Sequence, residues 1–295
     1  MNFNEELQYR IQDAEDVITR YLPAEEGFQH TVLEAMNYAV LAGGKRLRPI
    51  IMKETCRLFD GHSRAIEPFM AAIEFIHTSS LVHDDLPCMD NDTLRRGKPS
   101  VWAKYGEDMG TLAGDALMLY AFEVAAKAFL LSADTKNLGR AVGILANKSG
   151  IFGMVGGQTL DVEMTGKPLD EDQIGYIYEN KTAALLEASM MIGAVLADAS
   201  KEDILRCEQI ASKIGIAFQI RDDILDVTST AEVLGKPIGS DEENGKTTFV
   251  TLHSLEEAEA EVERLMNEAV AELHLLTGEN PFLEELLRSL IAREK

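Results

Sequence analysis

Two stretches decide the fold, GDALMLYAFEVAAKAF at residues 114–129 and KTAALLEASMMIGAVLA at residues 181–197. Wound as helices, both carry small and apolar residues on most of their faces, and helices of that kind belong in the middle of a bundle. Both lie inside longer segments rich in Ala, Leu, Met and Glu, bounded by Gly, Pro, Asp or Ser clusters that indicate helix ends. We therefore expect helices over roughly residues 65–86, 108–131, 171–198 and 201–227.

The rest of the chain also has a helical pattern. Apolar residues recur at spacings of three and four, as in Leu7, Ile11, Ala14 and Ile18. Pro49 would fall just inside the start of a helix, where its missing N–H costs nothing. Alternating strand patterns are hard to find and only 8 prolines interrupt the sequence. No repeat or linker divides it, so we expect one large all-α domain spanning residues 1–295.

The composition excludes several classes of protein. The chain has 28 Lys and Arg against 50 Asp and Glu, a net charge of −22 at pH 7. An excess of that size would repel phosphate backbones, which argues against a nucleic-acid-binding protein. With 46% hydrophobic and 26% charged residues, the chain can form an ordinary globular core. An enzyme or a small-molecule binder remains.

The cysteines and the N-terminal residues indicate in which cellular compartment the protein is expected. The three cysteines, Cys56, Cys88 and Cys207, are odd in number and far apart, which favours a reduced intracellular protein. Residues 1–22 are acidic and amphipathic, unlike a signal peptide. The longest apolar stretches are far shorter than the ~20 residues that span a bilayer. We expect a cytoplasmic protein without a transmembrane segment.

The first of two acidic clusters lies in HDDLPCMDNDTLRRG, residues 83–97. Its acidic residues are Asp84, Asp85, Asp90 and Asp92, and Arg95 and Arg96 follow. Pro87 must interrupt the helix, because proline lacks the N–H and clashes with the preceding turn. The residues after the proline can then loop out and return Asp90 to the neighbourhood of Asp84.

The second cluster lies in QIRDDILDV, residues 219–227, and holds Asp222, Asp223 and Asp226. Asp222 and Asp226 are four residues apart, so their carboxylates share one face of a helix. Like charges at that spacing are mildly destabilising unless a cation sits between them. Carboxylates without His or thiolate suit hard ions, and Mg²⁺ takes phosphate oxygens beside one or two carboxylates. The alternative is an acidic protein that places aspartates on a solvated face.

Basic residues supply the complementary half of the pattern. AGGKRLRP places Lys45, Arg46 and Arg48 directly after a Gly-Gly break, where loop N–H groups and a helix start favour an anion. Further candidates beside turns or helix starts are Arg95, Arg96, Lys181, Lys236 and Lys246. Taken singly, each is an ordinary surface cation. Together with two Mg²⁺ sites, they suggest two diphosphate sites, one metal-dependent and one held by Arg and Lys alone.

These motifs resemble a known family. The motifs are GGKRLRP, DDLPCMDNDTLRRGKPS, GGQTLD, ENKTAALLEAS, FQIRDDILD and GKPIGSDEENGKTTF, in this order over nearly the whole chain. They are similar to those of the short-chain trans-isoprenyl diphosphate synthases, the bacterial and plastid farnesyl and geranylgeranyl diphosphate synthases. The resemblance implies the isoprenoid synthase fold, a bundle of about ten or more antiparallel helices around a deep central cavity. It also implies a homodimer.

The resemblance further implies a reaction. Isopentenyl diphosphate would condense head-to-tail with dimethylallyl, geranyl or farnesyl diphosphate, by ionisation, condensation and elimination. The allylic diphosphate would be held through about three Mg²⁺, with Mn²⁺ as a substitute. The implied metal ligands are Asp84, Asp90, Asp222 and Asp226, supported by Asp85 and Asp223. Isopentenyl diphosphate would bind without metal to Lys45, Arg48, His77 and Arg96.

The remaining implied roles fall on other motifs. The allylic diphosphate would contact Arg95, Lys181, Lys246 and, close by, Lys236. Thr182, Gln219 and the carbonyl of Lys181 would line the path of the carbocation, and Arg293 and Lys295 would help to close the site. Supporting roles are expected for His83, for Gln158 of GGQTLD and for Gly156 and Gly157, which would allow close helix packing; Asp161 belongs to the same motif.

Product length depends in this family on what blocks the cavity beneath the first aspartates. The residue five positions before Asp84 is Ser79, where many bacterial farnesyl diphosphate synthases have an aromatic residue. Ser79 and Ser80 are small, and Phe75 lies one turn deeper as a possible floor. An isoprene unit extends about 4–5 Å, close to one helical turn of about 5.4 Å. This favours geranylgeranyl diphosphate, whereas the bacterial resemblance favours farnesyl diphosphate, and both stay open.

Other functions fit less well. A class I terpene cyclase also ionises allylic diphosphates, but it needs no metal-free basic site, and its second metal motif normally mixes Asn, Ser and Glu. A non-catalytic or regulatory subunit of a heteromeric synthase would be expected to have lost aspartates, and all six are present. An acidic helical interaction protein leaves the ordered motifs unexplained.

Overall fold

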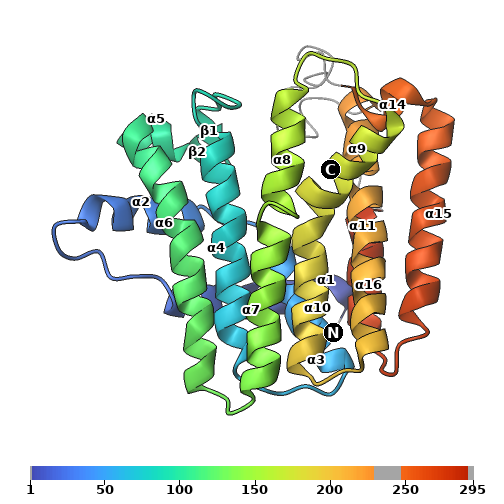
Figure 1. Ribbon diagram of the computed structural model, residues 1–295, viewed down its shortest axis with the longest axis horizontal. Coiled ribbons are helices and arrows are strands. Elements are labelled where there is room, and N and C mark those ends of the chain that lie inside the picture. The colour runs from blue at the N-terminus through green and yellow to red at the C-terminus, as the bar shows by residue number, and fades with distance from the viewer. Residues whose placement is uncertain (1, 229–246, 292–295) are drawn as a thin grey trace. The chain divides into compact units, whose positions relative to one another are not determined.

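The computed structural model of the chain describes residues 2–228 and 247–291, in which nearly all regular structure is helical (Figure 1). The chain divides into two compact units. Unit 1 comprises Met1–Lys53 and His62–Val142, and unit 2 comprises Glu54–Gly61 and Gly143–Lys295. Helices α3 (Leu47–Leu58) and α7 (Thr135–Ser149) belong in part to each. The prediction of a single domain over residues 1–295 stays a prediction.

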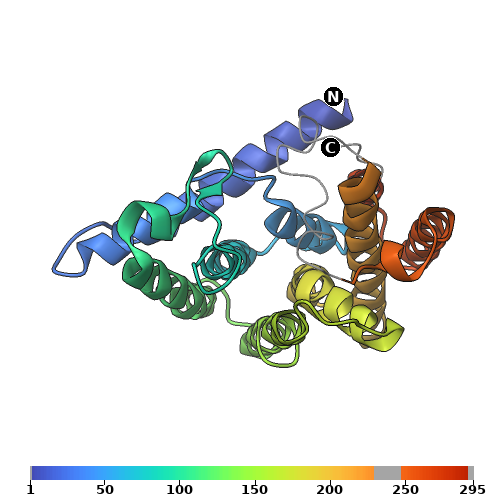
Figure 2. The same cartoon turned by 90° about the horizontal axis from the view of Figure 1, so that it is seen from above.

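Unit 1 is built around the antiparallel pair α4 and α6, which lie side by side in both views of the ribbon (Figure 2). Its elements are α1 (Phe3–Arg20), α2 (His30–Val40), α4 (Ile66–Asp84), β1 (Leu94–Arg95), β2 (Lys98–Pro99), α5 (Val101–Tyr105), α6 (Glu107–Ala126) and the 3₁₀ helix η1 (Lys127–Leu130). Helix α4 carries the core, because Phe69, Ile73 and Phe75 are fully buried. This core fixes the end of α4, where the first aspartates lie.

Unit 2 is built around α10 and α11, with α15 packed against α11. Its elements are α8 (Met154–Glu163), α9 (Glu171–Ile177), the π-helix η2 (Tyr178–Ala183), α10 (Ala184–Leu196), α11 (Lys201–Thr228), α14 (Phe249–Leu252), α15 (Leu255–Leu273) and α16 (Pro281–Ile291). Nearly every residue of α10 is buried. The prediction that the apolar stretch at 181–197 forms a core helix is confirmed.

Local sequence sets several helix ends. Helices α1, α9 and α15 each begin at a capping box, formed by Asn2 with Glu5, Asp170 with Gln173 and Ser254 with Glu257. Each cap satisfies backbone N–H groups that have no partner inside the helix. Pro49 lies in the first turn of α3, as predicted.

Two features differ from the sequence-based expectation. Helix α6 is not buried all round, since Leu112 and Leu119 are 49% and 74% exposed in the chain as described. One face of α6, which carries small residues together with Leu117 and Val124, is buried, and Leu112 and Leu119 lie outside that face. The predicted continuous helix over 171–198 is interrupted by η2, because six residues from Tyr178 adopt π-helical geometry. Such bulges insert an extra residue per turn and are frequent at functional sites.

Candidate active site

The first aspartate cluster follows the end of α4. The helix stops at Asp84, and Pro87 lies in the turn that follows. The turn brings the backbone N–H of Asp90 within 2.8 Å of the Asp84 carbonyl oxygen. The predicted return of Asp90 to Asp84 is therefore confirmed for the backbone. Asp84 is half-buried and Asp90 is exposed, so these two carboxylates are open to an incoming ligand.

The middle aspartate of this cluster points into the protein. Asp85 is 2% exposed, and its Oδ1 accepts hydrogen bonds from Arg95 Nε, at 2.9 Å, and from Arg95 Nη2. Burial lowers the pKa of the Arg95 guanidinium, but the bonds to Asp85 outweigh that effect and raise it. Asp85 thus holds Arg95 charged beside the cluster.

Arg95 and Arg96 lie on a tight hairpin. Leu94 pairs with Pro99 and Arg95 with Lys98, so Arg96 and Gly97 form the two-residue turn. Both turn residues have positive φ, 54° and 75°, the geometry that matches the twist of a hairpin. A non-glycine residue in this region is strained, and such strain gathers at functional sites.

The hairpin contacts the Gly-Gly loop. Arg96 Nη1 donates to the carbonyl oxygen of Gly43. A Cβ atom on Gly44 would lie 2.9 Å from the Arg96 guanidinium, so only glycine allows this approach. Lys45, in the same loop, is exposed, and Arg48 follows in the first turn of α3. The structure thereby brings together Arg96 and the GGKRLRP loop, which the resemblance assigned to one diphosphate.

Beneath this loop lies a buried ion pair that the sequence did not reveal. Arg46 Nη1 and Glu74 Oε1 are 2.8 Å apart, and Arg46 Nη2 donates to the Val40 carbonyl oxygen at 2.6 Å. Arg46 Nε also lies 3.6 Å from Glu15 Oε1. His77 Nδ1 lies 3.7 Å from the same Glu74 oxygen. Glu74 is therefore the buried counter-charge of the basic cluster.

The electrostatics follow from that arrangement. Burial would raise the pKa of Glu74, but His77 and Arg46 hold it well below its usual range. Burial and the positive Arg48 lower the pKa of His77 to about 4, with Glu74 opposing the shift. Burial also lowers the pKa of Arg48 and of Arg96. His77 is thus a neutral imidazole near pH 7.

The charges around Glu74 do not balance. Among the described residues, three guanidiniums, those of Arg46, Arg48 and Arg96, interact with one fully buried carboxylate, and Glu15 is only half-buried. Arg46 is buried, Arg48 is half-buried and Arg96 is exposed, and an anion with more than one negative charge would relieve their excess of positive charge. This cluster has the chemistry of a metal-free diphosphate site.

The second aspartate cluster occupies the last turns of α11. Asp222 is half-buried and Asp226 is buried, and both belong to the predicted face of the helix. The middle residue, Asp223, is 3% exposed and accepts from Tyr178 Oη, from Gln219 Nε2 at 3.1 Å and from the Phe249 N–H at 3.3 Å. Its carboxylate is engaged inside the protein, as that of Asp85 is.

The predicted carbocation-stabilising groups meet in unit 2. Thr182 Oγ1 donates to Gln219 Oε1 at 2.9 Å, so these two residues lie together as the resemblance implied. Lys181 Nζ lies 2.5 Å from Asp161 Oδ2 of GGQTLD. A Cβ atom on Gly157 would lie 2.3 Å from the Lys181 nitrogen, which confirms the expected close packing of α8 against η2.

Two of the candidate chain-length residues, Phe75 and Ser79, share one face of α4, and Ser80 lies beside it. Ser79 is fully buried and donates to the Ile76 carbonyl oxygen at 2.8 Å. Ser80 is half-buried and donates to the His77 carbonyl oxygen at 2.9 Å. Phe75 is fully buried and stacks on Tyr120, with 5.8 Å between ring centroids. A bulky ring at residue 75 is therefore fixed in place, whereas residue 79 carries only a small side chain.

His83, the residue before Asp84, packs against α6. Its ring nitrogen Nε2 lies 3.2 Å from the Thr111 carbonyl oxygen and 3.4 Å from Asp115 Oδ1. A Cβ atom on Gly114 would lie 2.2 Å from the same nitrogen, so the imidazole packs directly on α6. The supporting role expected for His83 stays a prediction.

The donor set of the two clusters fits magnesium. Asp84, Asp90, Asp222 and Asp226 offer hard carboxylate oxygens, the type that Mg²⁺ prefers. Within residues 2–228 and 247–291, no three His, Cys, Asp or Glu side chains gather closely enough to hold a metal ion. The ion would therefore need oxygens from water or a diphosphate as well.

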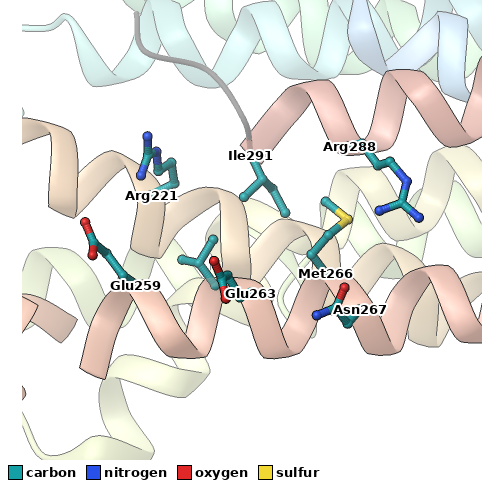
Figure 3. A pocket seen from close by; sticks show the side chains of 8 residues that line it. Arg221, Glu259, Glu263, Met266, Asn267, Arg288 and Ile291 are labelled. Atoms are coloured by element: carbon teal, nitrogen blue, oxygen red, sulfur yellow. The ribbon is translucent and has the colours of Figure 1, made fainter. Parts of the chain in front are cut away.

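A separate open pocket of about 750 Å³ lies in unit 2 (Figure 3). It lies among α11, α15 and α16, and α15 contributes Glu259, Glu263, Met266 and Asn267. Arg221, the residue before Asp222, lines it together with Arg288 and Ile291. Its charges are mixed, and it contains no predicted site residue.

Some predictions fall where the structure gives no description. Lys236, Lys246, Arg293 and Lys295 lie outside the described residues. Among the helices that are described, none has the length and apolar character needed to cross a membrane.

Comparisons with known proteins identify the family. The polyprenyl synthetase family model matches residues 29–275. The chain is 38% identical over 300 residues to the farnesyl diphosphate synthase of Escherichia coli (strain K12), and the match covers 100% of both chains. It is 45% identical over 242 residues to the chloroplastic heterodimeric geranylgeranyl pyrophosphate synthase large subunit 1 of Arabidopsis thaliana. That match covers 80% of this chain and 65% of the relative, so the chain spans less than two thirds of that relative's length.

Solved structures agree with the family match. A FPP/GFPP synthase from Zymomonas mobilis has a TM-score of 0.87 and 35% identity, with 99% of each chain covered. The geranyltransferase of Helicobacter pylori, complexed with magnesium and isoprenyl diphosphate, has a TM-score of 0.83 and 33% identity over 99% of this chain and 97% of the other. The predicted all-α isoprenoid synthase fold is confirmed. The chain belongs to the polyprenyl synthetase family, as its resemblance to the short-chain trans-isoprenyl diphosphate synthases implied.

Proposed function

We propose that this protein is a Mg²⁺-dependent trans-prenyltransferase. It would condense isopentenyl diphosphate head-to-tail with dimethylallyl, geranyl or farnesyl diphosphate and release pyrophosphate. Farnesyl diphosphate, geranylgeranyl diphosphate or both would be the product. The observation that carries the proposal is the basic cluster of unit 1, in which Arg46 pairs with the buried carboxylate of Glu74 and the guanidiniums of Arg48 and Arg96 interact electrostatically with it. A terpene cyclase needs no such metal-free site.

The residues divide between two diphosphates. Lys45, Arg48, His77 and Arg96 would hold isopentenyl diphosphate, with His77 as a neutral partner because of its low pKa. The allylic diphosphate would contact Arg95 and Lys181, together with Lys236 and Lys246 outside the described residues. Asp84, Asp90, Asp222 and Asp226 would hold about three Mg²⁺, which Mn²⁺ can replace. Bound Mg²⁺ would neutralise charge on the departing pyrophosphate.

The chain's own groups would then guide the cation. The allylic C–O bond breaks and its electron pair leaves with pyrophosphate. Thr182 and Gln219 would present oxygen dipoles to the allylic cation without bonding to it. The alkene of isopentenyl diphosphate forms the new C–C bond, and the resulting cation loses a proton to the released pyrophosphate. Side chains around the site must exclude water, because water would trap the cation.

The test is product analysis with Mg²⁺ and labelled isopentenyl diphosphate, using dimethylallyl, geranyl and farnesyl diphosphate separately as starters. We expect label in farnesyl or geranylgeranyl diphosphate. No incorporation with any starter would overturn the proposal and favour a non-catalytic subunit. Prenyl-chain elongation that stops at farnesyl diphosphate would indicate that Phe75 closes the cavity early. A geranylgeranyl product would indicate that Ser79 leaves the cavity open.

Product length has a matched test on α4. Ser79→Tyr places a ring in a fully buried position, so it should shorten the product by at least one isoprene unit. Ser80→Tyr, one position along the helix, shows whether a ring at the half-buried second candidate position shortens the product less. An unchanged product in Ser79→Tyr would remove Ser79 from the cavity floor.

A cytoplasmic homodimer completes the proposal. Leu112 and Leu119 lie seven residues apart on α6 and remain exposed in the single chain. An exposed apolar stripe of this kind supports association with a second copy. Sedimentation equilibrium should give twice the mass of one chain, and a monomer at micromolar concentration would contradict this part of the proposal.

A further inference from the structure

We propose that Tyr178 is a positioning residue for prenyl transfer, which fixes the Gln219 amide and the Thr182 hydroxyl through Asp223. This role rests on the proposed function, in which Thr182 and Gln219 stabilise the allylic cation. Tyr178 is buried, with 7% of its surface exposed, and it starts the π-helix η2. Its hydroxyl reaches the middle residue of the second aspartate cluster.

Two side-chain hydrogen bonds connect η2 to α11. Tyr178 bonds to Asp223, and Thr182 bonds to Gln219 at 2.9 Å. Tyr178 and Thr182 are four residues apart on η2, and Gln219 and Asp223 are four residues apart on α11. Both contacts therefore lie along the same line between the two helices. Nearby, a Cβ atom on Gly215 would lie 2.3 Å from the Ala183 Cβ, which shows how closely the two helices pack. The π-helical geometry thus presents Tyr178 and Thr182 to the same face of α11.

Asp223 accepts hydrogen bonds from both sides of this contact between η2 and α11. Its Oδ2 accepts from Tyr178 Oη and, at 3.3 Å, from the Phe249 N–H, which also lies 2.9 Å from Tyr178 Oη. Its Oδ1 accepts from Gln219 Nε2 at 3.1 Å. All three of these donors are neutral, and each of them bonds to the buried carboxylate directly. Removing one donor would weaken the network that holds this carboxylate in place.

The orientation of Gln219 follows from the chemistry of its neighbours. An ionised carboxylate can only accept hydrogen bonds, so the amide must turn its NH₂ group toward Asp223. The amide oxygen then faces Thr182 and accepts its hydroxyl hydrogen. The lone pairs of Thr182 Oγ1 are consequently directed away from Gln219. Lone pairs turned toward an allylic cation stabilise it, whereas a hydroxyl hydrogen pointing the same way would repel it.

Tyr178→Phe tests this role with the smallest change. It keeps the ring and removes only the hydroxyl, so Asp223 can shift and Gln219 loses its fixed orientation. We expect kcat to fall about tenfold, the loss of roughly one positioning hydrogen bond, while both KM values stay within about twofold. Tyr176→Phe is the matched control, because Tyr176 lies two residues earlier and is 42% exposed. It should leave kcat unchanged.

A double-mutant cycle separates positioning from a general structural effect. If Tyr178 acts by orienting Thr182, Tyr178→Phe should have little further effect in a Thr182→Val background. Asp223→Asn gives a second route to the same test, because an asparagine can donate as well as accept and no longer fixes the amide. Its effect on kcat should likewise be non-additive with Thr182→Val. This second cycle decides the matter if Tyr178→Phe does not fold.

The outcomes are distinct. Additive losses in the cycle, a raised KM with unchanged kcat, or an equal loss in Tyr176→Phe would overturn the positioning role and leave the proposed function standing. A wild-type protein that incorporates no isopentenyl diphosphate would overturn both. Non-additive losses confined to kcat are the result we expect.

Discussion

The middle aspartates of the two clusters are both turned into the protein, but their partners differ. Asp85 in unit 1 is held by the guanidinium of Arg95, whereas Asp223 in unit 2 is held by a tyrosine hydroxyl, an amide and a backbone N–H. In unit 1 the carboxylate therefore positions a cation, and in unit 2 it orients neutral dipoles. Under the proposed function, the same sequence element, a pair of adjacent aspartates, would support diphosphate binding in one unit and cation stabilisation in the other.

The largest expected effect is on kcat, and it should distinguish the outer aspartates of each cluster, such as Asp84 and Asp222, from the middle ones. Asp84→Ala or Asp222→Ala removes a proposed metal ligand and should lower kcat by about 10³-fold or more. Both should also raise the Mg²⁺ concentration needed for half-maximal activity, measured by incorporation of labelled isopentenyl diphosphate. Asp223→Asn should reduce kcat only about tenfold and leave the Mg²⁺ requirement unchanged.

Asp16→Ala on the exposed face of α1 is the control for these variants, and it should behave as the wild type. Full activity in Asp84→Ala would refute the assignment of the first cluster. A Mg²⁺ requirement that rises as much in Asp223→Asn as in Asp222→Ala would erase the difference between outer and middle aspartates.

Salt should distinguish the two middle aspartates. In EDTA and low salt, Asp85→Asn and Asp223→Asn should each lower the free energy of unfolding by about 2 kcal/mol, since each weakens hydrogen bonds to a buried carboxylate. Arg95 is partly exposed, so added salt screens its pairing with Asp85 and should shrink the cost of Asp85→Asn. The cost of Asp223→Asn should change less, because Asp223 is 3% exposed and the hydrogen bonds from Tyr178, Gln219 and the Phe249 N–H come from neutral donors. Urea unfolding at two salt concentrations makes the comparison, and equal salt dependence would contradict it.

A smaller effect concerns the pH dependence of unit 1. His77 has a pKa of about 4 in the folded protein, below its ordinary value of 6.5, so the unfolded chain binds its proton first. Stability from the neutral imidazole is therefore present above pH 6.5 and is lost as pH falls toward 4. Relative to His77→Gln, the wild type should lose about 2 kcal/mol of unfolding free energy over that window.

Urea titrations at pH 4.5, 5.5, 6.5 and 7.5 measure this difference. His274→Gln is the matched control, because that exposed histidine pairs with Glu284 on the surface. Parallel curves for the wild type and His77→Gln would show that His77 titrates normally and that unit 1 does not bury it as a neutral group.

Much of the fold could be predicted from the sequence, because helical periodicity is a local property. The core helices and the return of Asp90 after Pro87 followed from spacing and proline chemistry. The π-helix at Tyr178 could not be predicted, since it keeps the apolar pattern of an ordinary helix. The two-residue strands around Arg96 are too short to show alternation, although the Arg-Gly pair is a turn signal.

The parts of the candidate site that could not be predicted are contacts between residues far apart in the sequence. Glu74 lies 28 residues from Arg46, and neither spacing nor composition indicates that they pair. The same holds for Tyr178 with Asp223, separated by 45 residues. The expectation that 114–129 would be buried all round was wrong for Leu119, because an apolar helix face can also remain exposed on a single chain. Local patterns identified the reactive residues, and tertiary packing supplied their partners.

The most direct test of the central claim is calorimetric binding of isopentenyl diphosphate in EDTA. The basic cluster of unit 1 should bind it without metal, and Arg48→Gln should weaken binding at least about tenfold, the loss of one charge-assisted contact. Arg64→Gln, at an exposed arginine of the same unit, should bind as the wild type does. Binding that requires Mg²⁺, or that is unchanged in Arg48→Gln, would contradict a metal-free diphosphate site around Glu74.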